Sequence, residues 1–283
     1  MKTGLVLEGG AMRGLFSAGI TDVLDEQGIT FDGIIGVSAG TAFGCNIKSR
    51  QPGRAIRYNS RYAKDWRYCS LRSLLTTGDL YGGEFCYHYL PQHLDIFDTE
   101  TYDKNPVDFC VVCTDVETGK AVYQHLPKAG DTCYEWIRAS ASMPLCSKPV
   151  CIEKQKLLDG GIADSIPLQY FQRIGYERNV VILTQPEGYV KRRNRFLPLF
   201  RLWLHRYPQF ITAAAHRHEM YNAELEYVRQ EERKGTVYVL RPQEPLPIGH
   251  ISHDPRQMRQ VYELGRDMAN RQIESIRAFV KGN

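Results

Sequence analysis

Ser38 is the first residue of this chain whose setting suggests chemistry. It occupies the centre of Gly36-Val-Ser-Ala-Gly40, after the apolar residues Ile34 and Ile35 and before a stretch of small residues that suits a helix. A Gly-x-Ser-x-Gly pattern between a strand and a helix is typical of a nucleophile elbow, in which the serine hydroxyl stands clear of the sheet. Such a serine takes a strained backbone conformation, which neighbours without a Cβ atom make tolerable. The alternative is a glycine-rich turn that carries a solvated serine.

A serine becomes a good nucleophile only when a base takes its proton. Asp159 is a candidate base, because it follows a predicted strand at 156–158 and precedes Gly160 and Gly161. Two glycines after the acid would let this loop approach another loop closely. The alternative is an ordinary Asp-Gly turn, which is a common loop signal. Asp164 is the competing acid, and we interpret it as a cap for the helix that follows.

A glycine-rich turn, Gly9-Gly-Ala-Met-Arg-Gly14, lies between a predicted strand at 4–8 and a predicted helix at 15–27. Its register differs from that of a dinucleotide-binding turn. Backbone N–H groups at the start of a helix, with Arg13 nearby, suit an anion and therefore a developing oxyanion. The alternative is a plain turn between a strand and a helix.

The elements around these residues predict an α/β fold. The strand at 4–8, the helix at 15–27 and the strand at 34–37 form a βαβ unit, which favours a mostly parallel central sheet with helices on both faces. Apolar runs and spacings further predict strands at 107–114, 121–125, 179–184 and 236–240, and long helices at 207–233 and 256–280. We expect residues 1–175 to form a catalytic core. We expect residues 176–283 to complete the same domain and to include a C-terminal helical extension.

Three motifs, Glu8–Gly14, Gly36–Gly40 and Asp159–Gly161, together resemble the patatin-like phospholipase family, in particular its bacterial-type serine acyl hydrolases. They occur in the order found in that family, and Ala139-Ser-Ala-Ser-Met-Pro144 is similar to the small-residue segment before the family's aspartate. The resemblance covers roughly residues 3–175. It implies a hydrolase of carboxylic esters in lipids, of the phospholipase A, lysophospholipase or acylglycerol lipase type, that uses neither metal nor cofactor.

The resemblance also implies roles for single residues. Ser38 would be the nucleophile and Asp159 its partner in a Ser-Asp dyad, and the backbone of Gly9, Gly10 and Ala11, helped by Arg13, would form the oxyanion hole. The family usually has a glycine where this chain has Ala11. A methyl group is tolerable there at negative φ and costly at positive φ.

Other mechanisms and functions remain alternatives. An α/β-hydrolase triad would need a histidine after the acid, and the candidates are His205, His216, His218, His250 and His253. None of them lies in a short glycine-flanked loop, whereas Asp159 does, so we favour the dyad. The same site could instead serve an esterase or acyltransferase for small soluble esters, and a lipid-binding regulator would use the elbow only structurally.

Composition limits the class of protein. The chain has 283 residues, of which 43% are hydrophobic, enough for a large buried core. Its N-terminus lacks the apolar length of a signal peptide, and we expect a cytoplasmic protein. The eight cysteines are irregularly spaced and are expected to be reduced. Cys110 and Cys113 would point to opposite faces of a strand, which argues against a metal or redox pair. No acidic cluster with the spacing of a calcium loop occurs.

The formal net charge of +4 is concentrated locally, with the densest basic run at 191–195. No nucleic-acid-binding module accompanies this run. In the segment 191–206, basic residues flank Phe, Leu and Trp, a composition that suits peripheral contact with an anionic membrane or a cover over an acyl-binding cleft. The alternative is a helix packed on the sheet. The tyrosine-rich stretch 58–102 has two interpretations as well, core packing or the lining of a substrate cleft.

Overall fold

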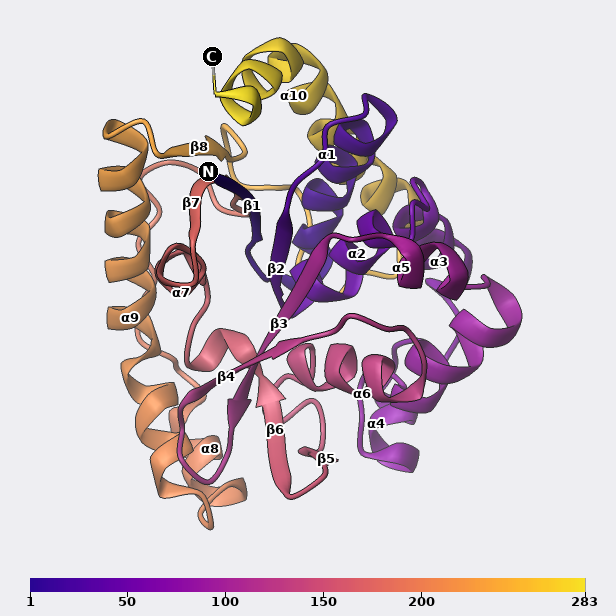
Figure 1. The fold of residues 1–283 in the computed structure, drawn as a ribbon. Coiled ribbons are helices and arrows are strands. Elements are labelled where there is room, and N and C mark those ends of the chain that lie inside the picture. The colour runs from indigo at the N-terminus through magenta and orange to yellow at the C-terminus, as the bar shows by residue number, and fades with distance from the viewer. Residues whose placement is uncertain (283) are drawn as a thin grey trace.

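One mixed sheet with helices on both faces organises the protein (Figure 1). The computed structural model describes residues 1–282. The sheet has eight strands in the order β5-β6-β3-β2-β1-β7-β8, with β4 paired to β3 beside this path. The strands are β1 (Lys2–Leu7), β2 (Gly33–Val37), β3 (Asp108–Asp115), β4 (Ala121–His125), β5 (Val150–Ile152), β6 (Gln155–Asp159), β7 (Tyr176–Ile182) and β8 (Val237–Leu240).

The centre of the sheet is parallel, as the sequence predicts. Strands β1, β2, β3, β7 and β8 form the parallel pairs, and Leu5 of β1 lies opposite Ile34 of β2. Strands β4, β5 and β6 add antiparallel pairs at one side. Strand β2 is buried along its whole length, because helices cover both faces of the sheet.

Helices form two layers around this sheet. They are α1 (Gly14–Glu26), α2 (Ala39–Lys48), α3 (Arg54–Tyr62), α4 (Leu71–Thr77), α5 (Thr99–Lys104), α6 (Asp131–Ser140), α7 (Leu168–Arg173), α8 (Leu197–Trp203), α9 (Pro208–Arg233) and α10 (Pro255–Lys281). Helices α1, α2, α6 and α10 contribute to the hydrophobic core on one face, and α7 and α9 to the core on the other. Cys113 belongs to the first core and Cys110 to the second, so the two thiols diverge as predicted.

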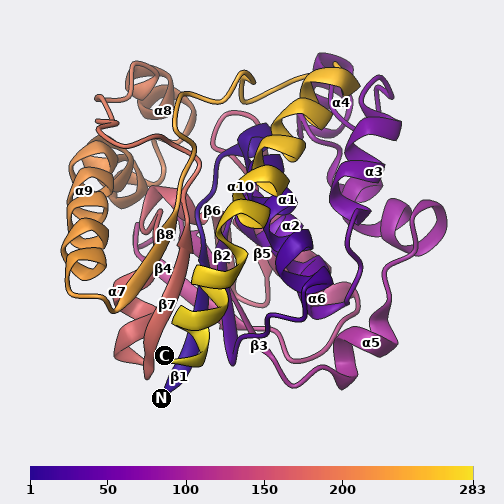
Figure 2. The same ribbon diagram turned by 90° about the horizontal axis from the view of Figure 1, so that it is seen from above.

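The last helix lies directly against the first (Figure 2). Gly19 of α1 and Gly265 of α10 make this approach feasible. A Cβ atom on Gly265 would lie 2.0 Å from the carbonyl oxygen of Phe16, and one on Gly19 would lie 2.1 Å from that of Tyr262. The C-terminal helix therefore belongs to the same helix layer as α1, where it also contacts β7 and β8.

Local details differ from the sequence-based expectations at helix starts. Helix α6 begins after Gly130, and no side chain caps it. The interpretation of Asp164 as a helix cap is wrong. Pro167 precedes α7, whereas the carboxylate of Asp164 accepts a hydrogen bond of 2.6 Å from the hydroxyl of Tyr123.

Candidate active site

Ser38 forms the sharp turn between β2 and α2 and has φ 56° and ψ −122°. These angles are strained for a residue with a side chain, as expected of a nucleophile elbow. The glycines of the motif are required by close backbone contacts. A Cβ atom on Gly36 would lie 2.7 Å from the nitrogen of Thr41, and one on Gly40 would lie 2.5 Å from the carbonyl oxygen of Leu7. The sequence pattern therefore reflects steric need at both positions.

Ser140, at the C-terminal end of α6, stabilises this elbow through hydrogen bonds. The backbone N–H of Ser38 donates to its Oγ atom over 3.0 Å, and that hydroxyl donates in turn to the carbonyl oxygen of Val112 over 2.7 Å. The hydroxyl of Thr41 lies 3.1 Å from the same oxygen. Sequence reasoning missed Ser140. The only available signal was its place in the small-residue segment 139–144.

Asp159 ends β6, which the pairing with β3 brings toward the elbow. Its backbone is fixed on both sides, because its N–H donates to the carbonyl oxygen of Ser142 over 2.8 Å and its carbonyl accepts from the hydroxyl of Thr114 over 2.8 Å. Its Oδ1 atom accepts the N–H of Gly161, also over 2.8 Å. A Cβ atom on Gly160 would lie 2.1 Å from the carbonyl oxygen of Val112. The two glycines thus allow the close approach that the sequence suggested.

Burial raises the pKa of Asp159 above its usual value. The neighbouring hydroxyl of Ser38 has the largest opposing influence, followed by Arg217, the N–H of Gly161 and Lys191. A carboxylate that lies beside the serine hydroxyl and has a raised pKa is suited to accept a proton. Asp164 lies apart from this pair, at the hydroxyl of Tyr123.

The glycine-rich turn closes the third side of the site. A Cβ atom on Gly9 would lie 2.9 Å from Cβ of Ser38, and one on Gly10 would lie 2.8 Å from the hydroxyl oxygen of Thr184. Ala11 has φ 50°, so the methyl-bearing residue occupies the left-handed conformation that a third glycine would adopt freely. Such a conformation costs a residue with a Cβ atom about 1–2 kcal/mol.

Two cavities meet at Ser38. The first, of about 110 Å³, is mainly apolar and aromatic; among its lining residues are Met12, Phe43, Tyr58, Tyr68, Tyr81 and Tyr87. The second, of about 630 Å³, is polar and contains Asp159, Gly9, Gly10, Arg13, Lys191 and Arg217 in its walls. Ala11, Ser38 and Met143 line both. Tyrosines of the tyrosine-rich stretch therefore line this cavity, although Tyr58 and Tyr68 also belong to the buried core, and Tyr102 is fully buried.

The candidate histidines divide into two groups. His250 and His218 line the polar cavity; Nε2 of His250 lies 3.2 Å from Nη1 of Arg13, and Nδ1 of His218 lies 3.1 Å from the carbonyl oxygen of Ala215. The other three make contacts elsewhere: His205 with the carbonyl of Leu202, His216 with Glu219, and His253 with the carbonyl of Ala63. Within residues 1–282, none of the five is hydrogen-bonded to Ser38, whose hydroxyl lies beside Asp159 instead.

Comparison with known families matches residues 5–171 to the patatin-like phospholipases. The chain belongs to that family. The phospholipase family and the lysophospholipase relatives described below make this patatin-like chain a lipid ester hydrolase with a patatin-like α/β fold. A second family, described as a domain of unknown function (DUF6363), matches residues 207–281.

Several characterised and uncharacterised proteins resemble this patatin-like chain. The uncharacterized protein YjjU of Escherichia coli (strain K12) is 27% identical over 288 residues, which cover 94% of this chain and 75% of YjjU. Lysophospholipase nte1 of Aspergillus oryzae is 29% identical over 220 residues, which cover 71% of this chain and only 13% of the fungal protein. The crystal structure of VipD from Legionella pneumophila matches 97% of this chain and 67% of VipD, with a TM-score of 0.48 and 12% identity.

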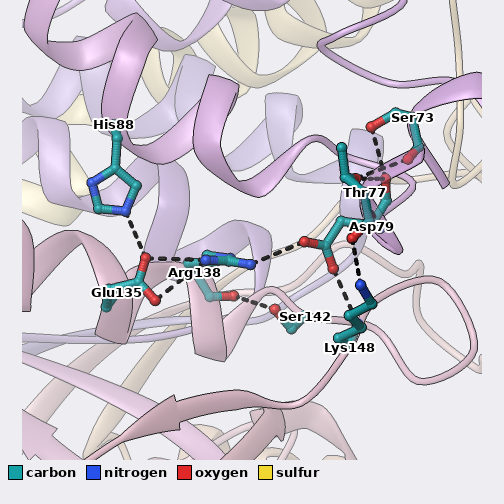
Figure 3. A network of polar contacts seen from close by, with 8 residues as sticks. All are labelled: Ser73, Thr77, Asp79, His88, Glu135, Arg138, Ser142 and Lys148. Carbon is teal, nitrogen blue, oxygen red and sulfur yellow. Dashed lines mark hydrogen bonds and ion pairs between the residues drawn. The ribbon is translucent and has the colours of Figure 1, made fainter.

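A polar network supports the apolar cavity of this patatin-like chain (Figure 3). Nε2 of His88 lies 2.6 Å from Glu135, whose carboxylate also accepts from Arg138 over 3.2 Å. Arg138 reaches Asp79 over 3.0 Å, and Asp79 accepts the backbone N–H of Lys148 over 3.0 Å. The network joins α6 to the π-helical segment Phe85–Leu94, and both elements contribute walls of the apolar cavity.

Across residues 1–282, no cluster of three or more His, Cys, Asp or Glu side chains is arranged to hold a metal ion. In the same range, no helix combines the length and the apolar character that crossing a bilayer requires.

Proposed function

We propose that this protein is a serine acyl hydrolase in which Ser38 is the nucleophile and Asp159 the proton acceptor. The observation that carries the proposal is the position of Ser38, on a strained elbow beside the buried carboxylate and at the junction of two cavities. The substrate would be a lipid with one ester-linked acyl chain at the serine, of the phospholipid, lysophospholipid or acylglycerol type. The similarity to fungal lysophospholipases supports this range.

The reaction follows from these two side chains. Oγ of Ser38 attacks the ester carbonyl carbon while the carboxylate of Asp159 accepts the hydroxyl proton. The tetrahedral intermediate collapses, the ester C–O bond breaks, and Asp159 returns the proton to the leaving alcohol. Water then attacks the acyl-enzyme, with its proton passing to Asp159 and on to Ser38, and the fatty acid leaves.

The glycine-rich turn is the best source of oxyanion stabilisation. The N–H of Ser38 is already used by Ser140. Among residues 1–282, the N–H groups of Gly10 and Ala11 have no hydrogen-bond partner, and both residues line the polar cavity beside the serine. Free N–H groups at this place can receive the negative charge of the intermediate. The guanidinium of Arg13 adds positive charge to the same side of the cavity.

We further propose that α8 and the segment before it contact an anionic membrane. Leu197 and Phe200 are buried beside α9, whereas Leu202 and Trp203 are 68% and 71% exposed. The segment also carries a series of basic residues: Arg192, Arg193, Arg195 and Arg201. Exposed apolar side chains among basic ones favour an anionic lipid surface. Phe196 and Arg192 line the polar cavity, so such contact would place lipid at its mouth.

A second exposed apolar pair supports the same orientation. Leu71 and Leu75 of α4 are 72% and 87% exposed, and their spacing puts them on one face of the helix. Figures 1 and 2 show α4 and α8 along the same edge of the molecule. Ile251, another exposed residue, lines the polar cavity. One flat lipid surface could therefore touch both helices.

Fatty-acid release from phospholipids, lysophospholipids and acylglycerols tests the proposed reaction. Wild type is compared with Ser38→Ala and Asp159→Asn, and all three are titrated with a fluorophosphonate that labels active serines. Release that is lost in both variants supports the dyad. Full activity of Asp159→Asn would overturn the dyad and favour a histidine base. Cleavage of small esters alone would make the protein a soluble-ester hydrolase, and absence of labelling would favour a lipid-binding regulator.

Sedimentation with vesicles tests the membrane contact separately. Wild type is expected to bind vesicles that contain anionic phosphatidylglycerol more strongly than phosphatidylcholine vesicles. The double variant Leu202→Ser, Trp203→Ser should lose this binding, whereas Leu264→Ser, an exposed leucine of α10, should keep it. Equal binding by wild type and the double variant would refute the assignment of this surface.

A further inference from the structure

Positively charged side chains converge on the polar cavity from distant parts of the chain. Arg13 comes from the turn before α1, Lys191 from the segment before α8, and Arg217 from α9; His250 comes from the loop before α10. All four line the cavity that contains Ser38. Because these residues are far apart in the sequence, no sequence motif predicted the cluster.

The contacts of Arg13, Lys191 and Arg217, the three cations of this cluster, are with uncharged groups. Nη1 of Arg13 lies 3.2 Å from the ring of His250, and its Nε is buried without a hydrogen-bond partner among residues 1–282. The ammonium of Lys191 lies 4.3 Å from the centre of the Tyr221 ring. Nε of Arg217 donates to the carbonyl oxygen of Gly161. The cluster therefore lacks direct charge compensation from these partners.

The two carboxylates that line the cavity are engaged elsewhere. Glu8 accepts the hydroxyl of Tyr221 over 2.5 Å, and the N–H and hydroxyl of Thr184 over 2.5 and 3.1 Å. Asp159 accepts from Gly161 and faces Ser38. Neither is hydrogen-bonded to a cation of the cluster in residues 1–282.

Repulsion within the cluster contributes to a lowered pKa of Lys191. Burial, Arg217 and Arg13 together lower the pKa of Lys191 to about 8, against the opposing effects of Glu8 and Asp159. Partial burial of the ring, together with Arg13, Lys191 and Arg217, also lowers the pKa of His250. Like charges gathered in a half-buried cavity are costly unless an anion joins them.

We propose that this cavity binds the phosphate group of a lysophospholipid whose single acyl chain lies in the apolar cavity beside Ser38. The assignment rests on the proposed hydrolase function and names the class of substrate. Guanidinium and ammonium groups are the side chains that recognise phosphate, and here they line the polar cavity, which shares Ser38 with the apolar cavity. One ester group can then meet Ser38 while the two ends of the substrate occupy two different environments.

The division between the cavities predicts selection by headgroup. A neutral acylglycerol would fill the apolar cavity equally well but would leave the cations without a counter-charge. The phosphate-bearing ester is therefore expected to react with a higher kcat/KM, since selection depends on the difference in transition-state binding. A charge-assisted hydrogen bond corresponds to a preference of roughly tenfold to a hundredfold.

Soluble substrates allow this preference to be measured without a membrane. We would compare kcat/KM for hexanoyl lysophosphatidic acid and monohexanoylglycerol, which differ in the phosphate alone. Wild type should prefer the phosphate ester by at least about tenfold, and Lys191→Gln should lose most of this preference because its kcat/KM for the phosphate ester falls more than that for the neutral ester. Lys191→Arg should retain the preference, and Arg259→Gln, an exposed arginine of α10, serves as the control. Equal preference in wild type and Lys191→Gln would overturn the proposal.

A binding measurement separates this inference from the hydrolase function. Glycerol 3-phosphate and inorganic phosphate contain no ester of a fatty acid, so their binding to wild type by calorimetry does not depend on catalysis. Stronger binding of glycerol 3-phosphate than of phosphate, weakened in Lys191→Gln, supports a lipid headgroup site. Equal binding of the two would indicate a site for free phosphate, and absence of both binding and preference would refute the phosphate site even if neutral esters are cleaved. Binding without any ester cleavage would instead refute the hydrolase function and leave the phosphate site intact.

Discussion

The backbone N–H of Ser38 donates to Oγ of Ser140, 3.0 Å away, and this bond ties the elbow to α6. The same hydroxyl donates to the carbonyl oxygen of Val112 in β3. One buried side chain thus fixes the strained turn to a helix and to the central sheet. The bond also removes the N–H of Ser38 from the groups available to an oxyanion.

Replacement of Ser140 by alanine should weaken both stability and catalysis. It would leave the N–H of Ser38 and the carbonyl of Val112 without their partner, which costs about 1–3 kcal/mol in the free energy of unfolding. Urea denaturation and kcat for a soluble ester would measure the two effects. Ser17→Ala is the matched control, because the Ser17 hydroxyl is buried without a partner in residues 1–282 and its loss should cost little. Equal effects of the two substitutions would contradict the role given to Ser140.

Ala11→Gly should stabilise the protein slightly. Glycine relieves the left-handed strain of about 1–2 kcal/mol, and the greater freedom of the unfolded chain offsets about 0.5–1 kcal/mol of that gain. We expect a small rise in the melting temperature. Ala214→Gly, at a buried position inside α9, should have the opposite sign, since glycine disfavours a helix by about 1 kcal/mol. A lowered melting temperature for Ala11→Gly would show that the turn gains from its methyl group.

The pH dependence of neutral ester cleavage should report the titration of Asp159. The carboxyl must be ionised to accept the proton of Ser38, and burial raises its pKa. Activity is therefore expected to fall on acidification at a pH above the usual range of an aspartic acid, because protonation occurs earlier than in an exposed side chain. The pH profile of kcat/KM would test this, with circular dichroism to confirm that the fold persists. An acidic limb at the usual aspartate pKa would contradict it.

Preference for phosphate should decline as the pH rises through about 8, where Lys191 loses its proton. The neutral ester should show no matching decline. Lys191→Arg should keep the preference at higher pH, since arginine remains charged. The ratio of kcat/KM for the two hexanoyl substrates measures the effect. The other charged or titratable groups that line this cavity with the lysine are Glu8, Arg13, Asp159, Tyr189, Arg192, Arg217, His218, Tyr221 and His250.

Contact between α1 and α10 should tolerate no side chain at Gly265. A methyl group there would meet the carbonyl of Phe16 at 2.0 Å, so Gly265→Ala must push the two helices apart. Overpacking of this kind costs about 1–3 kcal/mol. Urea denaturation would measure the loss. Gly249→Ala is the control, because a Cβ atom there would lie 3.4 Å from its nearest neighbour. An unchanged unfolding midpoint for Gly265→Ala would contradict close packing of these helices.

Sequence patterns predicted the features of the fold and the candidate site that depend on neighbouring residues in the chain. The elbow at Ser38 and the close turn after Asp159 could be predicted because each depends on adjacent glycines. The central strands and the long helices could be predicted from the spacing of apolar residues, which is also a local property of the sequence. The sign of φ at Ala11 depends on the turn as a whole and could be stated only as two alternatives.

Features built from distant segments were beyond these patterns. Lys191, Arg217 and His250 approach Arg13 only because α9 and the loop before α10 return to the glycine-rich turn. The role of Asp164 was predicted wrongly because its hydrogen-bond partner, Tyr123, lies on β4, far from it in the sequence. Such pairings leave no regular spacing in the chain.

Helix α9 also bears on the order in which the site can be completed. It provides Arg217 to the carbonyl of Gly161 and Tyr221 to the carboxylate of Glu8. During synthesis, Ser38 and Asp159 emerge from the ribosome before Arg217 and Tyr221 of α9. The nascent chain therefore holds the proposed nucleophile and base before the groups that brace their loops. Maturation of the site is a late step of synthesis, and a truncated translation product would carry the catalytic motifs without their support.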